Sequence, residues 1–309
     1  MSTGPEGTQP ADYRLADLEM GVIVFFWAMN WLVMKAGVHD AGGLSFAALR
    51  LIGATAIMVL ISLVIRAPIL PVAGERVRMA WIGFWQVAIM LTPSVVGLQF
   101  IGPGRAAVLV YTMQLWVLPL GWLVSRERVR PVAVAGSLIG FSGLMIYMNP
   151  ALVNWHDHRL LLGNALVLSS GIGWAFGASL YRSRKWKSPA WTQTTWQILW
   201  SALAVAPVAW FFGEHNVRWT GTLAMSLAFN WVITTAVCYW LWARALTAMP
   251  ASRAGQMVSL VPVLALLMSA AWTGERLSGT IFLSMTLIIA GIILSVRQPS
   301  LQRSAASQL

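Results

Sequence analysis

The chain has 309 residues, of which 58% are hydrophobic and 10% charged, and its mean hydropathy is +0.70. Soluble domains carry about 25% charged residues, so this composition excludes a water-soluble globular protein and indicates an integral membrane protein. The formal charge of +11 would be compatible with nucleic-acid binding, but the basic residues alternate from loop to loop, which argues against it.

The chain begins with a polar segment that contains Glu6, Asp12, Asp17 and Glu19. It lacks the basic flank and the small-residue cleavage site of a signal peptide. We therefore expect an N-terminal tail over residues 1–19, followed by a first helix that is retained.

Beyond this tail, ten apolar runs are long enough to cross a membrane as helices, which takes about 20 residues each. The connections between them are short, so any binding has to occur within the helical bundle. The runs are 20–38, 44–66, 79–100, 103–125, 131–149, 160–181, 190–212, 220–243, 251–273 and 279–297.

The two halves of the chain repeat one another. Arg105-Ala106 recurs as Arg253-Ala254, 148 residues later, and Glu127-Arg128 recurs as Glu275-Arg276 at the same offset. Each copy holds five runs, so the chain leaves the first copy on the opposite side of the membrane and the second copy inserts upside down. We therefore predict an all-α integral membrane protein of ten transmembrane helices, arranged as two inverted five-helix repeats around a central cavity.

This organisation divides the chain into five parts. The predicted parts are a cytoplasmic tail (1–19), the first repeat (20–149), a periplasmic connecting loop (150–159), the second repeat (160–297) and a cytoplasmic C-terminal tail (298–309).

The charge distribution gives the orientation. Most of the 21 basic residues lie in one alternating set of loops and tails. For example, the first copy of the repeated Glu-Arg motif carries Arg126, Arg128 and Arg130, whereas the second copy carries only Arg276. The positive-inside rule therefore places both termini in the cytoplasm.

Within the spans the sequence has no carboxylate, and Arg50 is the only fully intramembrane charge. Because a proton-coupled pump for lipophilic cations needs a buried carboxylate, we predict a facilitator or exchanger of a neutral or zwitterionic solute. We expect Arg50 to lie against helix-end carbonyls or to extend toward the interface rather than to contact the solute. Lys35, at the outward end of the first span, binds a carboxylate or is an interfacial lysine.

Polar and aromatic residues that share helical faces form the candidate binding site, since residues three or four apart lie on one face. The alternative for each is an interhelical contact that holds the bundle together. The candidates are Trp27 and Asn30 in the first span, Tyr111 and Gln114 in the fourth, Trp174 in the sixth, Asn230 in the eighth, and Gln256 and Ser259 in the ninth.

Three further patterns have structural interpretations. Gly136, Gly140 and Gly143 form a small-residue stripe that we assign to helix packing. Gln114 stands where Pro262 stands in the second copy, so we expect the fourth helix to bend elsewhere. The tryptophans near span ends are expected to be interfacial anchors; they are Trp122, Trp155, Trp186, Trp191, Trp210, Trp219, Trp242 and Trp272.

Several motifs, in their order along nearly the whole chain, resemble EamA-type members of the drug/metabolite transporter superfamily, most closely the bacterial aromatic amino-acid exporters. They are Trp27-Ala28-Met29-Asn30 with Lys35, Phe46-Ala47-Ala48-Leu49-Arg50, and Pro262 to Gly274-Glu275-Arg276-Leu277 before Gly291. The resemblance implies a bacterial inner-membrane exporter of amino acids, aromatic and other apolar ones, that works by alternating access.

Other function classes remain as alternatives. The main alternative is efflux of other small metabolites or drugs. A channel or a membrane-embedded enzyme is less favoured, because the spans hold no ring of charges and no catalytic cluster. We expect no catalytic residue, no metal site, no cofactor and no nucleic-acid partner. The expected partners are a small-molecule solute and the lipid bilayer, and ten spans can enclose a cavity within a monomer.

Overall fold

Every regular element is a helix in the part of the chain that the computed structural model describes, which is residues 10–126, 131–148, 156–249, 251–274 and 278–296. This confirms the predicted all-α class. The elements are α1 (Pro10–Ala41), α2 (Gly43–Val64), η1 (Ala73–Glu75), α3 (Arg76–Gly83), η2 (Phe84–Ala88), α4 (Ile89–Gly97), α5 (Pro103–Tyr111), α6 (Met113–Ser125), α7 (Pro131–Met148), α8 (His158–Arg182), α9 (Ala190–Phe212), α10 (Gly221–Ala228), η3 (Phe229–Val237), α11 (Cys238–Ala248), α12 (Ala251–Val258), α13 (Val261–Thr273) and α14 (Gly279–Val296).

Eight helices in the described residues are long and apolar enough to cross a membrane. They correspond to the first eight of the ten predicted spans. Two shorter apolar stretches, Gln256–Trp272 and Gly279–Leu294, lie where the ninth and tenth spans are predicted. The ten-span count therefore stays a prediction for its last two members.

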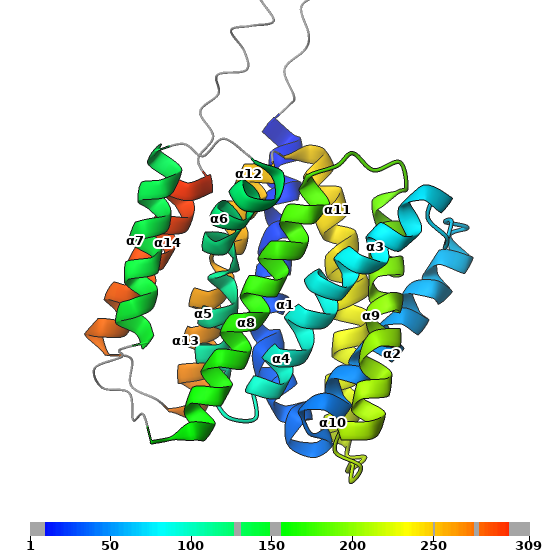
Figure 1. Ribbon diagram of the computed structural model, residues 1–309, viewed down its shortest axis with the longest axis horizontal. Helices are drawn as coiled ribbons and strands as arrows, with labels where there is room; N and C mark the ends of the chain where they lie inside the picture. Colours follow the sequence, from blue (N-terminus) through cyan, green and yellow to red (C-terminus); the bar gives the residue numbers. More distant parts are fainter. Residues whose placement is uncertain (1–9, 127–130, 149–155, 250, 275–277, 297–309) are drawn as a thin grey trace, which may run out of the picture.

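The helices stand roughly side by side, and the start of α1 lies at the same end of the bundle as the end of α14 (Figure 1). We call this the terminal end, and the opposite end, where α1 gives way to α2, the distal end. α1 begins at Pro10, inside the polar segment predicted as a tail, so the helix starts before the apolar run does. The connecting loop predicted at 150–159 lies mostly outside the described residues.

The first helix of each half packs against the other half. α1 contacts mainly α10, α11 and α13, whereas α8 contacts mainly α4, α6 and η2. The second helices follow the same rule, because α2 packs on α9 and η3 while α9 packs on α2, α3 and η2. The halves are therefore interleaved, and each site between them is built from both copies.

Helix interruptions occur at matching places in the two halves. The third segment of each half contains a π-helix, η2 or η3, and such insertions are frequent at functional sites. The fourth segment breaks at Thr112 in the first half and at Ser259–Leu260 in the second. The Thr112 and Ser259 hydroxyls each donate to a carbonyl three residues earlier, those of Leu109 and Gln256. The expectation that the first copy bends elsewhere is therefore wrong.

Close glycine contacts join α7 to α14. A Cβ on Gly291 would lie 2.4 Å from the Gly140 nitrogen and 2.6 Å from the Gly136 oxygen. A Cβ on Gly143 would lie 2.8 Å from the Ser284 oxygen. These distances leave no room for a side chain, which confirms that the glycine stripe serves helix packing.

Candidate functional site

An aromatic cluster lies where α1 meets the second half. The Trp27 ring centroid is 6.3 Å from that of Tyr239 and 6.0 Å from that of Trp242. The Trp27 indole nitrogen donates to the Thr234 carbonyl of η3 over 3.4 Å. We call Trp27, Tyr239 and Trp242 the Trp27 cluster; it is formed by one side chain from the first half and two from the second.

Two buried asparagines lie at the same depth in the bundle, next to this cluster. The Ser226 hydroxyl donates to the Val33 carbonyl over 3.0 Å, and this contact together with the Trp27–Thr234 bond brackets Asn30 on α1 and Asn230 on η3. Both side chains are buried. The two asparagines therefore lie at matching depth on adjacent helices.

The amide oxygens of both asparagines have no hydrogen-bond partner among the described residues. Only the Asn230 nitrogen is used, donating to the Ser226 carbonyl over 2.8 Å. Leaving a buried polar atom unpaired costs about 1–3 kcal/mol. Both oxygens are thus free acceptors for a group that the protein itself does not supply.

Tyr111 and Gln114 stand on either side of the break between α5 and α6. Tyr111 is buried and lies within electrostatic range of Tyr239. The Gln114 amide oxygen is buried and, within the described part of the chain, has no hydrogen-bond partner. The break in the helix thus presents a third unpaired acceptor, next to a buried tyrosine.

The second-half candidates are less closely connected. Trp174 packs against the hydrophobic core, but no ring contact joins it to the Trp27 cluster in the described residues. Ser259 is buried, and its hydroxyl is occupied by the Gln256 carbonyl. The structure therefore brings Trp27, Asn30 and Asn230 together and places Tyr111 within electrostatic range of Tyr239. In the described part of the chain, Trp174, Gln256 and Ser259 have no hydrogen bond or ring contact with them.

Arg50 follows Leu49, the residue through which α2 is hydrogen-bonded to η3. The Trp231 indole donates to the Leu49 carbonyl over 3.1 Å, which fixes α2 against η3 at this level. The Arg50 Nη1 lies 2.7 Å from the Met34 sulfur, and its guanidinium is within electrostatic range of Tyr239. Among the described residues it has no hydrogen bond to a backbone carbonyl, so of the two expected positions only extension toward the interface stays a prediction.

Tryptophans at span ends divide into two groups. Trp122, Trp210 and Trp272 are largely exposed, as expected of side chains that face lipid headgroups. Trp242 instead packs against Trp27, a contact that its interpretation as an anchor does not include. Its spacing of three residues from Tyr239 was the signal that places both on one helical face.

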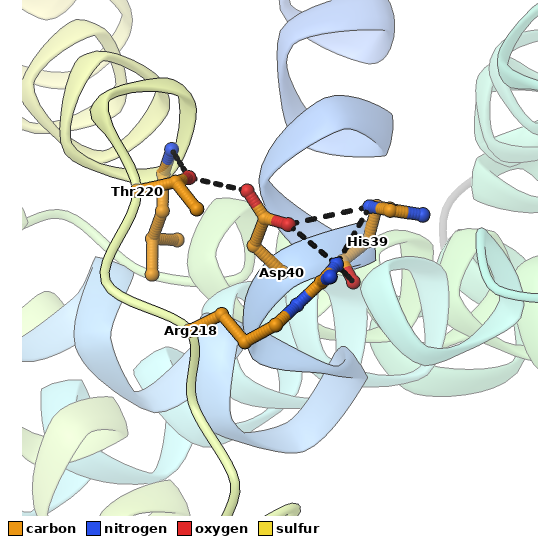
Figure 2. A network of polar contacts seen from close by, with 5 residues as sticks. His39, Asp40, Arg218 and Thr220 are labelled. Carbon is orange, nitrogen blue, oxygen red and sulfur yellow. Dashed lines mark hydrogen bonds and ion pairs between the residues drawn. The ribbon is translucent and has the colours of Figure 1, made fainter.

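A polar cleft of about 520 Å³ opens at the distal end, lined by residues that include Lys35, Gln99 and Arg159. Figure 2 shows its central network, in which Asp40 at the end of α1 accepts hydrogen bonds from Arg218 over 2.8 Å and from the Thr220 hydroxyl. The Thr220 hydroxyl also caps α10 by accepting from the Leu223 nitrogen. The network thereby ties α1 to the segment that leads into α10.

Lys35 projects toward the end of α4. Its ammonium donates to the Leu98 carbonyl and, over 3.2 Å, to the Ile101 carbonyl. Cations are favourable at helix C-termini, where carbonyls are unpaired. The structure thus shows Lys35 in a capping contact with backbone carbonyls. No carboxylate in the described residues is bonded to it.

Glu214 closes the distal end of α2. Its carboxylate accepts from the Gly43 nitrogen over 3.0 Å and from the Gln99 amide over 2.8 Å. Gly42 adopts a positive φ of 76°, and a Cβ there would lie 2.2 Å from the Glu214 Cδ, so the turn requires glycine. Burial raises the pKa of Glu214, but the hydrogen bonds from Gln99, Gly43 and Ser45 outweigh it and hold that pKa below its ordinary value.

Ion pairs hold α1 at the terminal end as well. Asp17 pairs with Arg253 over 2.6 Å, and Glu19 pairs with Arg244 over 2.8 Å. At the mirrored position Arg105 donates to the Asn164 side chain of α8 over 2.8 Å. α1 is therefore attached to the second half at both of its ends.

Comparison with known proteins places these features in a family. A profile described as the EamA-like transporter family matches residues 15–149 and again 161–297, so the two halves are copies of one unit. The uncharacterized transporter YoaV of Bacillus subtilis (strain 168) is 27% identical over 281 residues, covering 88% of this chain and 94% of that protein.

A protein of Escherichia coli (strain K12), named a probable amino-acid metabolite efflux pump, is 24% identical over 287 residues, which is 89% of this chain and 92% of that protein. A solved crystal structure aligns with a TM-score of 0.62 over 91% of this chain and 96% of that chain, at 16% identity. This last likeness shows a shared fold.

Proposed function

Since the chain belongs to the EamA-like transporter family, whose members are transporters and not enzymes, we propose that it exports amino acids, aromatic and other apolar ones, across the bacterial inner membrane. The transport is secondary and proceeds by alternating access. The name of the Escherichia coli relative, a probable amino-acid metabolite efflux pump, supports the substrate class.

The observation that carries this proposal is the position of the Trp27 cluster beside two buried, unpaired amide oxygens, those of Asn30 and Asn230. Binding pockets for small solutes combine apolar aromatic walls with a few well-placed polar groups. An aromatic or aliphatic side chain fits the wall, and an ammonium group fits the free acceptors.

The absence of a carboxylate from this region supports facilitation or exchange over obligate proton coupling. In the described residues the acidic side chains near α1 lie at its two ends, where Asp17, Glu19 and Asp40 are paired with arginines. No acid is thus left to alternate between a proton and a cationic solute.

The proposed mechanism uses ten spans in two inverted repeats around a central cavity, with both termini in the cytoplasm and the distal end facing the periplasm. The basic residues near the terminal end and the double match of one family profile support this arrangement. The chain works as a monomer, with the hairpins α3–α6 and α10–α13 moving against each other around the site.

Counterflow in sealed proteoliposomes tests the proposal. The vesicles are loaded with one unlabelled amino acid at a time, and the entry of labelled phenylalanine is followed. We expect exchange with aromatic and large apolar amino acids and no accumulation driven by a pH jump alone. Exchange with none of the amino acids would overturn the substrate class, and pH-driven accumulation would overturn the absence of proton coupling.

A further inference from the structure

Arg50 is an intramembrane charge with no acidic partner among the described residues. It lies seven residues after Gly43, about 10 Å along α2 from the distal end at 1.5 Å per residue. Its hydrogen-bond contact is the neutral thioether of Met34. The side chains that interact with it from neighbouring elements are Met34 of α1, through its sulfur, and Tyr239 of α11, electrostatically, and neither is acidic.

A charged side chain in this position is costly. Placing an arginine at the centre of a membrane span costs about 2.5–3.5 kcal/mol on insertion scales. A thioether sulfur is a weak acceptor and cannot compensate for lost hydration of a guanidinium. A partner from outside the protein would remove this cost each time the site is occupied.

The acidic side chains of the described chain are already in use. Asp17, Glu19 and Asp40 pair with arginines, and Glu75, Asp157 and Glu214 accept hydrogen bonds from backbone N–H groups. Among the described residues, therefore, no acidic side chain is paired with Arg50, and the carboxylate of a solute can supply its counter-charge.

The surroundings of Arg50 match the remaining groups of an α-amino acid. Asn30 and Asn230, with their unpaired amide oxygens, lie within about one helical turn of it on α1 and η3. The Trp27 cluster borders the same level, and its Tyr239 is within electrostatic range of the guanidinium. The guanidinium, two free amide oxygens and the aromatic cluster thus lie on neighbouring helices within about two helical turns of one another.

The second half lacks this charge. The residue of α9 that corresponds to Arg50, 147 positions later, is Gln197. An amide cannot provide the paired, charge-assisted hydrogen bonds with which a guanidinium holds a carboxylate. The anion-binding group therefore occurs once, on the side of the bundle formed by α1, α2 and η3.

We propose that the Arg50 guanidinium binds the carboxylate of the transported amino acid, while the amide oxygens of Asn30 and Asn230 accept hydrogen bonds from its ammonium and the Trp27 cluster contacts its side chain. This inference rests on the proposed function and specifies its substrate as zwitterionic. A compound without the carboxylate is a poor ligand.

The test measures ligand-induced thermal stabilisation of purified full-length protein with three compounds. Phenylalanine has both charged groups, phenethylamine lacks the carboxylate, and 3-phenylpropionate lacks the ammonium. The variants are Arg50→Gln, Arg50→Lys and, as a control at the other end of α2, the exposed Arg66→Gln. Size-exclusion profiles without ligand establish that each variant is folded.

We expect the wild type to bind phenylalanine in preference to phenethylamine. Arg50→Gln should lose affinity for phenylalanine by about 30-fold or more, as expected when one partner of a buried charge pair is removed. Arg50→Lys should keep part of the affinity because it keeps the charge, and Arg66→Gln should match the wild type. Wild-type affinity in Arg50→Gln, or equal wild-type affinity for phenylalanine and phenethylamine, would overturn the proposal.

Failure of the proposed function has a different signature. If proteoliposomes exchange no amino acid, the substrate class is wrong, and the role of Arg50 is then judged from 3-phenylpropionate. Binding of this anion that is lost in Arg50→Gln and kept in Arg66→Gln supports an anion site at Arg50. Binding of neither acid, or binding that does not depend on Arg50, overturns it. Should Arg50→Gln not fold, the comparison of Arg50→Lys with the wild type decides.

Discussion

α1 and α8 are corresponding helices, since each is the first helix of its repeat, but they pack differently against the opposite half. α8 packs closely through glycine, since a Cβ on Gly173 would lie 2.5 Å from Ile89 and one on Gly177 would lie 2.8 Å from Gln86. At the position of Gly177, 147 residues earlier, α1 carries Asn30. One helix is fitted against the hairpin of the opposite half, whereas the other presents a polar group there.

This difference indicates that the two repeats share their backbone architecture, whereas the polar and aromatic groups of the candidate site are not repeated. The helix breaks at Thr112 and Ser259–Leu260 and the π-helices η2 and η3 occur in both copies. The free acceptors Asn30 and Asn230 and the Trp27 cluster gather on the α1 side alone. A solute site built from these groups is asymmetric even though the frame around it is repeated.

The largest effect is expected from a side chain added to α8. Gly177→Leu pushes a branched side chain into the backbone of Gln86, and overpacking of this kind costs about 1–3 kcal/mol or more. We expect a lower melting temperature and a smaller folded fraction on size exclusion. Gly21→Leu on α1 is the control, because nothing lies within 4 Å of its added Cβ. Equal behaviour of the two variants would show that α8 is not closely fitted.

A substitution on α1 should affect transport rather than folding. Asn30→Leu removes a buried, unpaired amide and fills similar volume, so stability should be unchanged or slightly higher. The exchange of phenylalanine in counterflow should fall by about 10-fold, equivalent to one hydrogen bond to a charged group. Undiminished exchange in this variant would remove Asn30 from the site.

A smaller effect on transport is expected at Trp27 than at Asn30, and it should exceed the effect at Trp174, the corresponding residue of the second repeat. Trp27→Phe loses the bond to the Thr234 carbonyl and part of the aromatic contact, which is worth about 0.5–1.5 kcal/mol. Phenylalanine exchange should decrease by a few-fold, whereas Trp174→Phe should leave it within about twofold. A greater loss in Trp174→Phe than in Trp27→Phe would place the site on the α8 side instead.

The smallest effect concerns the distal cap on α2. The pKa of Glu214 lies below its ordinary value of 4.5, so its stabilising contribution is complete above that pH and disappears as the pH falls through the lowered value. Exposed interactions of this kind contribute below about 1 kcal/mol. The melting temperature of the wild type should therefore decline below about pH 4.5 slightly more than that of Glu214→Gln. If the melting temperatures of the two proteins changed with pH in parallel, Glu214 would not contribute to stability through this cap.

The sequence was sufficient to predict the helices, the repeat and part of the site. Hydropathy gave the spans, matched motifs gave the duplication, and helical spacing gave Trp27 and Asn30. It did not predict that α1 packs on the opposite half, because periodicity defines a face without naming the partner that covers it. For that reason the contact between Trp27 and Trp242 could not be predicted.

Arg50 was underestimated for a related reason. A lone intramembrane arginine commonly bonds backbone carbonyls or extends toward the interface. The hydropathy pattern does not reveal that Arg50 contacts Met34 and interacts electrostatically with Tyr239. The break at Thr112 was also missed. Its hydroxyl bond to Leu109 replaces the effect of the proline found in the second copy, and hydroxyl bonding to the backbone is not visible in a hydropathy pattern.

In the proposed mechanism, one site at the level of Asn30 opens in turn to each face of the membrane. Labelling Asn30→Cys in a Cys238→Ser background with a membrane-impermeant maleimide, added separately to each face of proteoliposomes, tests this most directly, since Cys238 is the one native cysteine. We predict modification from both faces and protection by phenylalanine at both. Modification from a single face, or from neither, would contradict alternating access through this site.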